Sequence, residues 1–144
     1  MGPWWYQVLH NFGSGTDGYW PWANLILDAA GNLYSTTFQG GTHSVGTVFE
    51  VTPASGGRWT EQVLHNFEAH PTGPDGYWPT AGLIFDAAGN LYGTTQYGGA
   101  YEAGTVFELT PVRPCAKCSH SMLREGDVLP AKRGVVLGAG AGSN

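Results

Sequence analysis

Short runs of β-branched and aromatic residues alternate with glycine-rich turns over the first 111 positions of the chain. In one such run, Thr105, Phe107 and Leu109 face one side, and the residues between them face the other. All of the runs are too short for a convincing helix, and their composition favours strands. The pattern therefore predicts an all-β chain.

The runs recur because most of the chain consists of two near-copies of one segment. Positions 17–53 return at 75–111, and 26 of these 37 residues are identical. Upstream, positions 7–12 recur as 62–67. A glycine-rich repeat of this length indicates a supersecondary unit that stacks on its neighbours to bury its apolar faces.

Each unit is predicted to contain four short strands that are separated by turns. The four strand types are seen at 82–85, 90–95, 104–110 and 59–67. Four antiparallel strands that repeat at about 55 residues are typical of a blade of a β-propeller. We therefore expect an all-β fold made of propeller-like blades.

Residues 1–111 are then two tandem propeller-type repeats. Residues 4–12 supply the last strand of a blade, residues 22–67 a full blade, and residues 80–111 the first three strands of the next. About two blades make an incomplete ring, because propellers close with about four to eight. Either the chain is a fragment of a longer array, or several copies assemble into a closed ring as a homo-oligomer.

The repeat resembles the GloVer tandem repeat of large bacterial proteins that look like propellers. The resemblance covers residues 4–111 and rests on these motifs: Leu-Ile-Phe-Asp-Ala-Ala-Gly-Asn-Leu-Tyr-Gly-Thr-Thr, Tyr-Gly-Gly, Gly-Thr-Val-Phe-Glu-Leu-Thr-Pro and Trp-Thr-Glu-Gln-Val-Leu-His-Asn-Phe. Proteins with this repeat are often exported or surface-anchored. The resemblance therefore implies a secreted or cell-surface location, and it implies no shared catalytic residue.

Charge is distributed unevenly along the chain. Residues 1–111 carry nine acidic side chains and a single basic one, Arg58. An acidic repeat region argues against binding to nucleic acid, which depends on Lys and Arg. No stretch is apolar and long enough to span a membrane, and the first residues lack the pattern of a signal peptide. Residues 112–144 contain no aromatic residue and are predicted to be an irregular, low-complexity and disordered tail.

The loops that join the strands predict one face for ligand binding. In an antiparallel order, the loop between the second and third strands emerges at the same end as the loop between blades. Aromatic rings beside carboxylates suit sugars, since the rings stack on CH surfaces and the carboxylates accept hydrogen bonds from hydroxyls. The candidate ligand-binding residues at this end are Asp17, Tyr19, Trp20, Asp75, Tyr77, Trp78, Tyr97 and Tyr101. The alternative is that Tyr77 and Trp78 fill the gap between adjacent blades.

Three motifs resemble metal sites but favour structural interpretations. Asp28 begins a turn that loosely resembles a calcium loop, yet an aspartate that caps its own hairpin fits better. His10 and His65 are expected at the edge of the core, hydrogen-bonded to backbone. Residues 115–120 hold two cysteines and a histidine, but a structural zinc site needs a fourth ligand. We therefore expect neither a metal nor a cofactor.

Catalytic motifs are weak in this sequence. It contains no nucleophile elbow, phosphate-binding loop or metal triad. Asp17, Asp75 and Glu102 are the carboxylates available for glycosidic cleavage, but nothing in the sequence pairs them. The sequence therefore predicts a non-enzymatic repeat module for binding or scaffolding, with a carbohydrate or a protein as ligand. The alternatives are a lectin-like propeller assembled by oligomerisation and a glycan-processing propeller enzyme.

Overall fold

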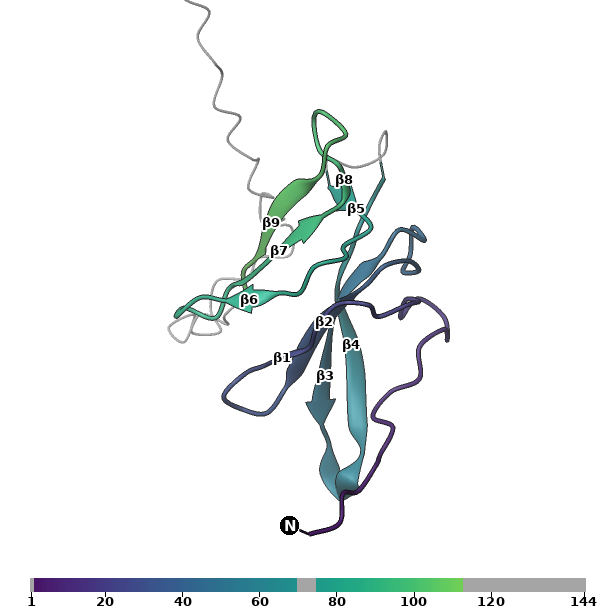
Figure 1. Cartoon of the computed structure of the whole chain (residues 1–144), viewed down its shortest axis with the longest axis vertical. Helices are drawn as coiled ribbons and strands as arrows, with labels where there is room; N and C mark the ends of the chain where they lie inside the picture. Colours follow the sequence, from purple (N-terminus) through teal and green to yellow (C-terminus); the bar gives the residue numbers. More distant parts are fainter. Residues whose placement is uncertain (1, 70–74, 113–144) are drawn as a thin grey trace, which may run out of the picture. The chain divides into compact units, whose positions relative to one another are not determined.

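A computed structural model describes residues 2–69 and 75–112 of the chain. The first repeat forms a four-stranded antiparallel sheet in the order β1-β2-β3-β4 (Figure 1). Its strands are β1 (Ile26–Leu27), β2 (Leu33–Thr37), β3 (Thr47–Pro53) and β4 (Trp59–Asn66), and a short 3-10 turn, η1 (Ser55–Gly57), joins the last two.

The second repeat forms a three-stranded antiparallel sheet in the order β6-β7-β9. Its strands are β6 (Ile84–Phe85), β7 (Leu91–Thr95) and β9 (Thr105–Leu109), and β5 (Gly76–Tyr77) and β8 (Tyr97–Gly98) form a separate two-stranded ladder. The prediction of an all-β chain with antiparallel strands is confirmed. That these sheets are blades of a propeller stays a prediction, as do the boundaries of the two repeats.

The two central hairpins share one register, which follows from their near-identical sequences. Thr37 lies opposite Thr47 in the first hairpin, and Thr95 lies opposite Thr105 in the second. In each pair the two hydroxyl oxygens are 2.8 Å apart. The backbone N–H of Thr47 also donates to the Thr37 hydroxyl, and that of Thr105 donates to the Thr95 hydroxyl. These threonine pairs fasten the end of each hairpin from which the aromatic loops emerge.

The core lies between the two sheets. Val48 and Phe67 from the first repeat are buried against Leu83 and Leu91 from the second. Phe67 packs edge-on against Phe107, with ring centroids 5.2 Å apart. Each repeat therefore buries one apolar face on its neighbour, as expected for a unit that stacks.

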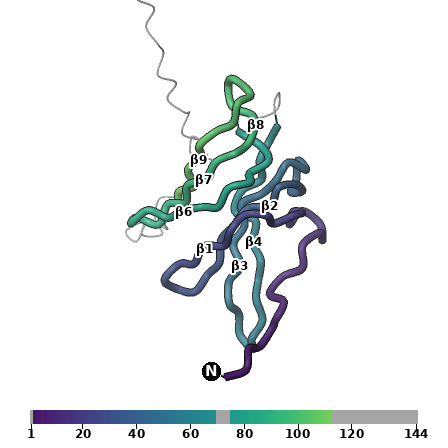
Figure 2. Tube along the Cα trace, viewed as in Figure 1, coloured from purple at the N-terminus to yellow at the C-terminus, as the bar shows by residue number. Residues whose placement is uncertain are grey.

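Residues 4–12, predicted to be a strand, carry no strand in the structure. Figure 2 shows this N-terminal segment, drawn in purple, outside the ladders of the two sheets. A strand needs a neighbouring edge for its backbone hydrogen bonds. Within the described part of the chain, no strand pairs with this segment. The predictions for residues 113–144, including the disordered tail and the motif at 115–120, concern residues outside the described part of the chain.

The tight turns after β1 and β6 are built on an aspartate, as predicted. The Asp28 carboxylate accepts hydrogen bonds from the backbone N–H groups of Ala30 and Asn32. It also accepts bonds from the Asn32 amide and the Tyr34 hydroxyl. The same four bonds recur around Asp86. The prediction that each aspartate caps its own turn is confirmed.

These turns lower the pKa of both aspartates. Burial raises the pKa of the Asp28 carboxyl, but the hydrogen bonds that Asn32 and its neighbours donate outweigh burial and bring the pKa below its ordinary value. At Asp86 the backbone bond from Asn90 is the largest cause, and the pKa is again lowered. A lowered pKa stabilises the fold above the unfolded-state value of about 4, and that stability is lost as pH falls through the folded-state value.

Asp28→Ala is expected to lower the free energy of unfolding by about 1 kcal/mol at pH 7, because solvent screening weakens hydrogen bonds in an exposed turn. The difference from the unaltered chain should shrink as the pH falls below about 4, where the carboxyl of the unaltered chain becomes protonated. Urea unfolding at pH 7 and at pH 3 measures both effects. Ala87→Ser, which keeps Asp86 in the equivalent turn, is the control. An equal loss at both pH values would contradict the role of the ionised carboxylate.

Within residues 2–69 and 75–112, no helix is long and apolar enough to cross a membrane.

Candidate functional site

The two aromatic loops of each repeat lie side by side, as the antiparallel order predicts. In the second repeat, β5 pairs with β8, so that Tyr77 lies opposite Tyr97. In the first repeat, Tyr19 forms an isolated bridge with Gln39. The predicted proximity of these loops is therefore confirmed, and it brings most of the candidate rings to one end of the sheets.

Two of these rings are carried by a strained backbone. Trp20 has a φ of 56° and Trp78 a φ of 57°, which is the left-handed region that bulky residues rarely adopt. Each is held by a backbone hydrogen bond from the neighbouring loop: the N–H of Phe38 donates to the Trp20 carbonyl, and that of Gln96 donates to the Trp78 carbonyl. Strain that both repeats retain suggests that the position of the indole ring matters.

Aromatic side chains from both repeats form one continuous row. In spatial order, this aromatic row consists of Trp20, Trp22, Phe38, Trp78, Tyr97 and Tyr77. Trp22 stacks on Phe38 with ring centroids 4.4 Å apart. Phe38 lies 5.3 Å from Trp78, so the row passes from the first repeat to the second.

The first half of the aromatic row is open to solvent. Trp20 is 53% exposed and Trp22 is 62% exposed. Sequence reasoning did not single out Trp22 or Phe38, because the second repeat has Thr80 and Gln96 at the equivalent positions. Residues that only one copy carries are missed when candidates are chosen for being identical in both copies. The spacing of Trp20 and Trp22, two residues apart, was the available signal.

Trp78 has a role in packing as well as a place in the row. It is only partly exposed, and its backbone N–H donates to the carbonyl of Val45 in the first repeat. Its ring contacts Phe38 of that repeat. The alternative that Trp78 fills the gap between repeats therefore has structural support. Trp20, its counterpart, is the more open of the two rings.

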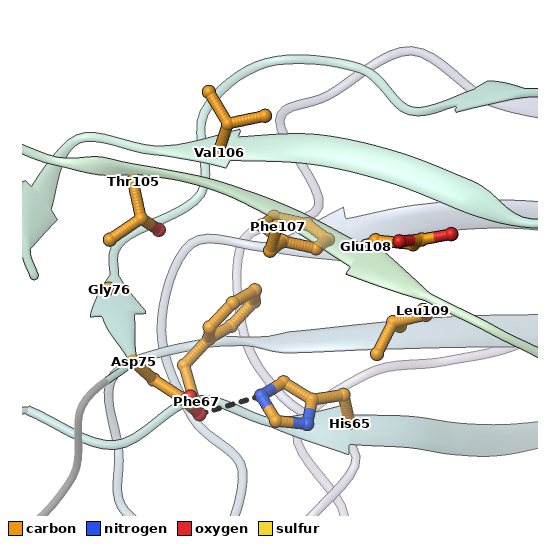
Figure 3. Close-up of a pocket in the computed structure, with 9 residues that line it drawn as sticks. All are labelled: His65, Phe67, Asp75, Gly76, Thr105, Val106, Phe107, Glu108 and Leu109. Atoms are coloured by element: carbon orange, nitrogen blue, oxygen red, sulfur yellow. Dashed lines mark hydrogen bonds and ion pairs between the residues drawn. The ribbon is translucent and has the colours of Figure 1, made fainter. Parts of the chain in front are cut away.

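The candidate aspartates are held by histidines. Nε2 of His10 lies 2.9 Å from the Asp17 carboxylate, and Nε2 of His65 lies 2.8 Å from that of Asp75. Asp17 is buried and also accepts a hydrogen bond from the backbone of Gly13. Figure 3 shows the second pair, where His65 and Asp75 point toward each other below β9. The expectation that these histidines bond to backbone is wrong, because each finds a carboxylate on the following loop.

The remaining candidate rings lie at the margin of the site. Tyr19 and Tyr101 are exposed outside the aromatic row, and Tyr101 stands in the loop after β8. The Tyr77 hydroxyl donates to the Glu102 carboxylate over 3.5 Å. Burial, followed by the nearby Glu102 charge, raises the pKa of the Tyr77 phenol. Tyr77 therefore stays a neutral hydrogen-bond donor at neutral pH.

In the described ranges 2–69 and 75–112, no three His, Cys, Asp or Glu side chains lie close enough together to hold a metal ion. Two of the three carboxylates considered for glycosidic cleavage, Asp17 and Asp75, are engaged with histidines, and Glu102 accepts from Tyr77. The arrangement offers a stacking surface with phenolic hydroxyls at one end. Such a surface binds flat apolar faces that carry polar rims.

In a comparison with known protein families, the model of the Gloeobacter/Verrucomicrobia repeat matches residues 4–140. No curated protein and no solved structure matches the chain significantly.

Proposed function

The chain belongs to the Gloeobacter/Verrucomicrobia repeat family, and we propose that it is a non-enzymatic repeat module that binds carbohydrate along the aromatic row. Membership confirms the resemblance that the repeat motifs indicated. The observation that carries the proposal is the continuous run of rings with its exposed half at Trp20 and Trp22. An extracellular setting is part of the proposal, since the resemblance is to proteins that are often exported.

The chemistry of the row supports a sugar more than other ligands. Pyranose rings present CH faces that stack on indole and phenol rings, and their rims carry hydroxyls. Tyr77 and Tyr97 stack with centroids 5.8 Å apart and place phenolic oxygens at one end of the row. An extended row spanning two repeats suits a chain of several sugar units better than a single one. The acidic repeat region also argues against an anionic polymer as the ligand.

Binding without turnover fits the state of the carboxylates. A glycosidase needs two carboxyl groups free to act on either side of one bond. Here Asp17 and Asp75 bind histidines, and both repeats place the same groups at equivalent positions. Such duplication favours several equivalent contacts with a polymer over one reaction centre.

The test measures binding of the full chain to a panel of neutral polysaccharides by affinity electrophoresis and calorimetry. Trp20→Asn removes an exposed ring and keeps a residue that tolerates positive φ, so the loop is not strained further. Combined with Trp22→Ala, it is expected to weaken binding at least about tenfold, because each lost stacking contact is worth about 1 kcal/mol. Trp4→Ala with Trp5→Ala, which removes two exposed tryptophans outside the row, is the matched control.

Three results would overturn the proposal. The first is that no polysaccharide in the panel binds to the unaltered chain. The second is that the row variant binds as tightly as the control while both remain folded. The third is the release of new reducing ends from a bound polysaccharide, which would identify an enzyme.

A further inference from the structure

The N-terminal segment has nearly the same sequence as β4, which is paired with β3 in the first repeat. Residues 7–12 are identical to residues 62–67, most of which lie in β4. β4 pairs with β3, whose sequence β9 repeats with one conservative change at Leu109. In the described part of the chain, no strand pairs with residues 7–12 or with the outer edge of β9. The segment and the edge are therefore complementary but unpaired.

Residues 7–12 contact the first repeat through the same two residue types that β4 and the residue after it use to contact the second repeat. The end of β4 and the residue after it bind the following repeat through His65 to Asp75 and through Phe67 to Phe107. The N-terminal segment binds the first repeat through the equivalent residues. His10 contacts Asp17, and the Phe12 and Phe49 rings lie 4.8 Å apart. What the segment lacks is a strand to lie beside.

Each of the two apolar faces that pack together within the chain has an exposed counterpart on the other repeat. Val48 of β3 is 0% exposed because it packs on the second repeat, whereas its counterpart Val106 is 79% exposed. On the other side, Leu83 is 2% exposed in the core, and its counterpart Leu25 is 56% exposed. Figure 3 shows Val106 pointing away from the residues that face His65.

The first repeat has a groove on the face that is equivalent to the face of the second repeat on which the first repeat packs. Its volume is about 410 Å³, and its apolar lining includes Leu9, Leu25, Leu33, Phe49 and Val51. The counterparts of these five residues are Leu64, Leu83, Leu91, Phe107 and Leu109, and all five belong to the core between the sheets. The groove is thus the unfilled copy of an interface that the chain forms once within itself.

We propose that copies of this chain associate head to tail by repeating their internal interface. Residues 7–12 of one copy add to β9 of another as the fourth strand of its sheet. The face of the second copy that carries Ile84 and Val106 fills the groove of the first. This association does not depend on the carbohydrate ligand. It is heterologous, so it closes into a ring if the rotation per copy allows and otherwise extends as an array.

A second copy is a better occupant of the β9 edge than the C-terminal residues of the same chain. Residues 112–144 contain no counterpart of the Gln-Val-Leu-His-Asn-Phe strand and no aromatic residue. Residues 7–12 have the complete sequence of that strand. The register follows from the pairs Glu50–Gln62 and Phe49–Val63, which place Gln7 opposite Glu108 and Val8 opposite Phe107.

Disulfide cross-linking between two separately made chains tests the register. One full-length chain carries Gln7→Cys, the other carries Glu108→Cys, and both have their natural cysteines replaced by serine. Mild oxidation of the mixture is expected to give a covalent heterodimer in high yield. Tyr6→Cys with Glu108→Cys is the control, because a shift of one residue turns the side chain to the opposite face. Cross-linking no better than this control would overturn the proposal.

Light scattering of the full chain tests the apolar face independently. We expect a mass above that of the monomer, with Val106→Glu returning the chain to a monomer. Val106 is exposed within one copy, so this change should leave the fold intact by circular dichroism. Val112→Glu, at an exposed position beyond β9, should keep the assembly. If the unaltered chain is a monomer at all concentrations, the proposal is wrong. The β9 edge would then be covered by the chain's own C-terminal residues or by another protein.

Discussion

Phe67→Ala is expected to lower the free energy of unfolding by about 3–4 kcal/mol, which is a large part of the stability of a domain of this size. Phe67 is almost fully buried, and its ring meets Phe107 at 5.2 Å and His65 at 4.9 Å. It lies just after β4 and packs against Leu83 and Leu91 of the next repeat. Removing the ring leaves a cavity between two sheets that depend on each other for burial.

Phe12→Ala is the matched control for this change. Phe12 follows the same five residues in sequence and has the equivalent ring contact with Phe49, but it is partly exposed. Its loss should cost only about 1–2 kcal/mol, in proportion to the smaller area buried. Urea unfolding followed by tryptophan fluorescence measures both at a concentration low enough to keep the chain monomeric. Equal losses would contradict a core centred between the repeats.

Much of the fold follows from the repeat, because alternation and turn chemistry act locally. The outward positions of Val106 and Glu108 and the aspartate turn at Asp28 are properties of short segments. The strand at 4–12 was predicted by the same logic, since its sequence matches that of β4. The structure leaves it unpaired, because a strand depends on a neighbouring edge that its own sequence does not supply.

The site was predicted less completely than the strands. Antiparallel order was enough to bring the loop of Trp78 beside that of Tyr97. It was not enough to show that Asp17 and Asp75 would be held by histidines, because those pairs join a strand end to the following loop. Repetition also hid Trp22, which only the first copy carries. Differences between the copies identify the exposed stacking surface better than their identities do.

Gly76→Ala is expected to lower the free energy of unfolding by about 2–4 kcal/mol, because it combines overpacking with the loss of a partly buried hydrogen bond. A Cβ at Gly76 would overlap the Thr95 hydroxyl and approach that of Thr105 to 2.6 Å. Those hydroxyls are 2.8 Å apart, and the Thr105 backbone also donates to Thr95. The substitution would separate β5 from the hairpin and loosen the loop that carries Tyr77.

Steric overlap with Thr95 and Thr105 is the specific cause, and three further variants isolate it. Gly82→Ala serves as the control, since its Cβ would come no nearer than 3.6 Å to another atom and should change stability by less than about 1 kcal/mol. A Cβ at Gly76 would also lie 2.5 Å from the Thr95 Cβ, so the background must be Thr95→Gly, which removes both overlapping atoms, and there Gly76→Ala should cost markedly less than it does alone. Thermal unfolding of the unaltered chain, the two single variants and the double variant gives the coupling energy between Gly76 and Thr95. Additive losses at Gly76 and Thr95 would show that β5 is not seated on the threonine pair.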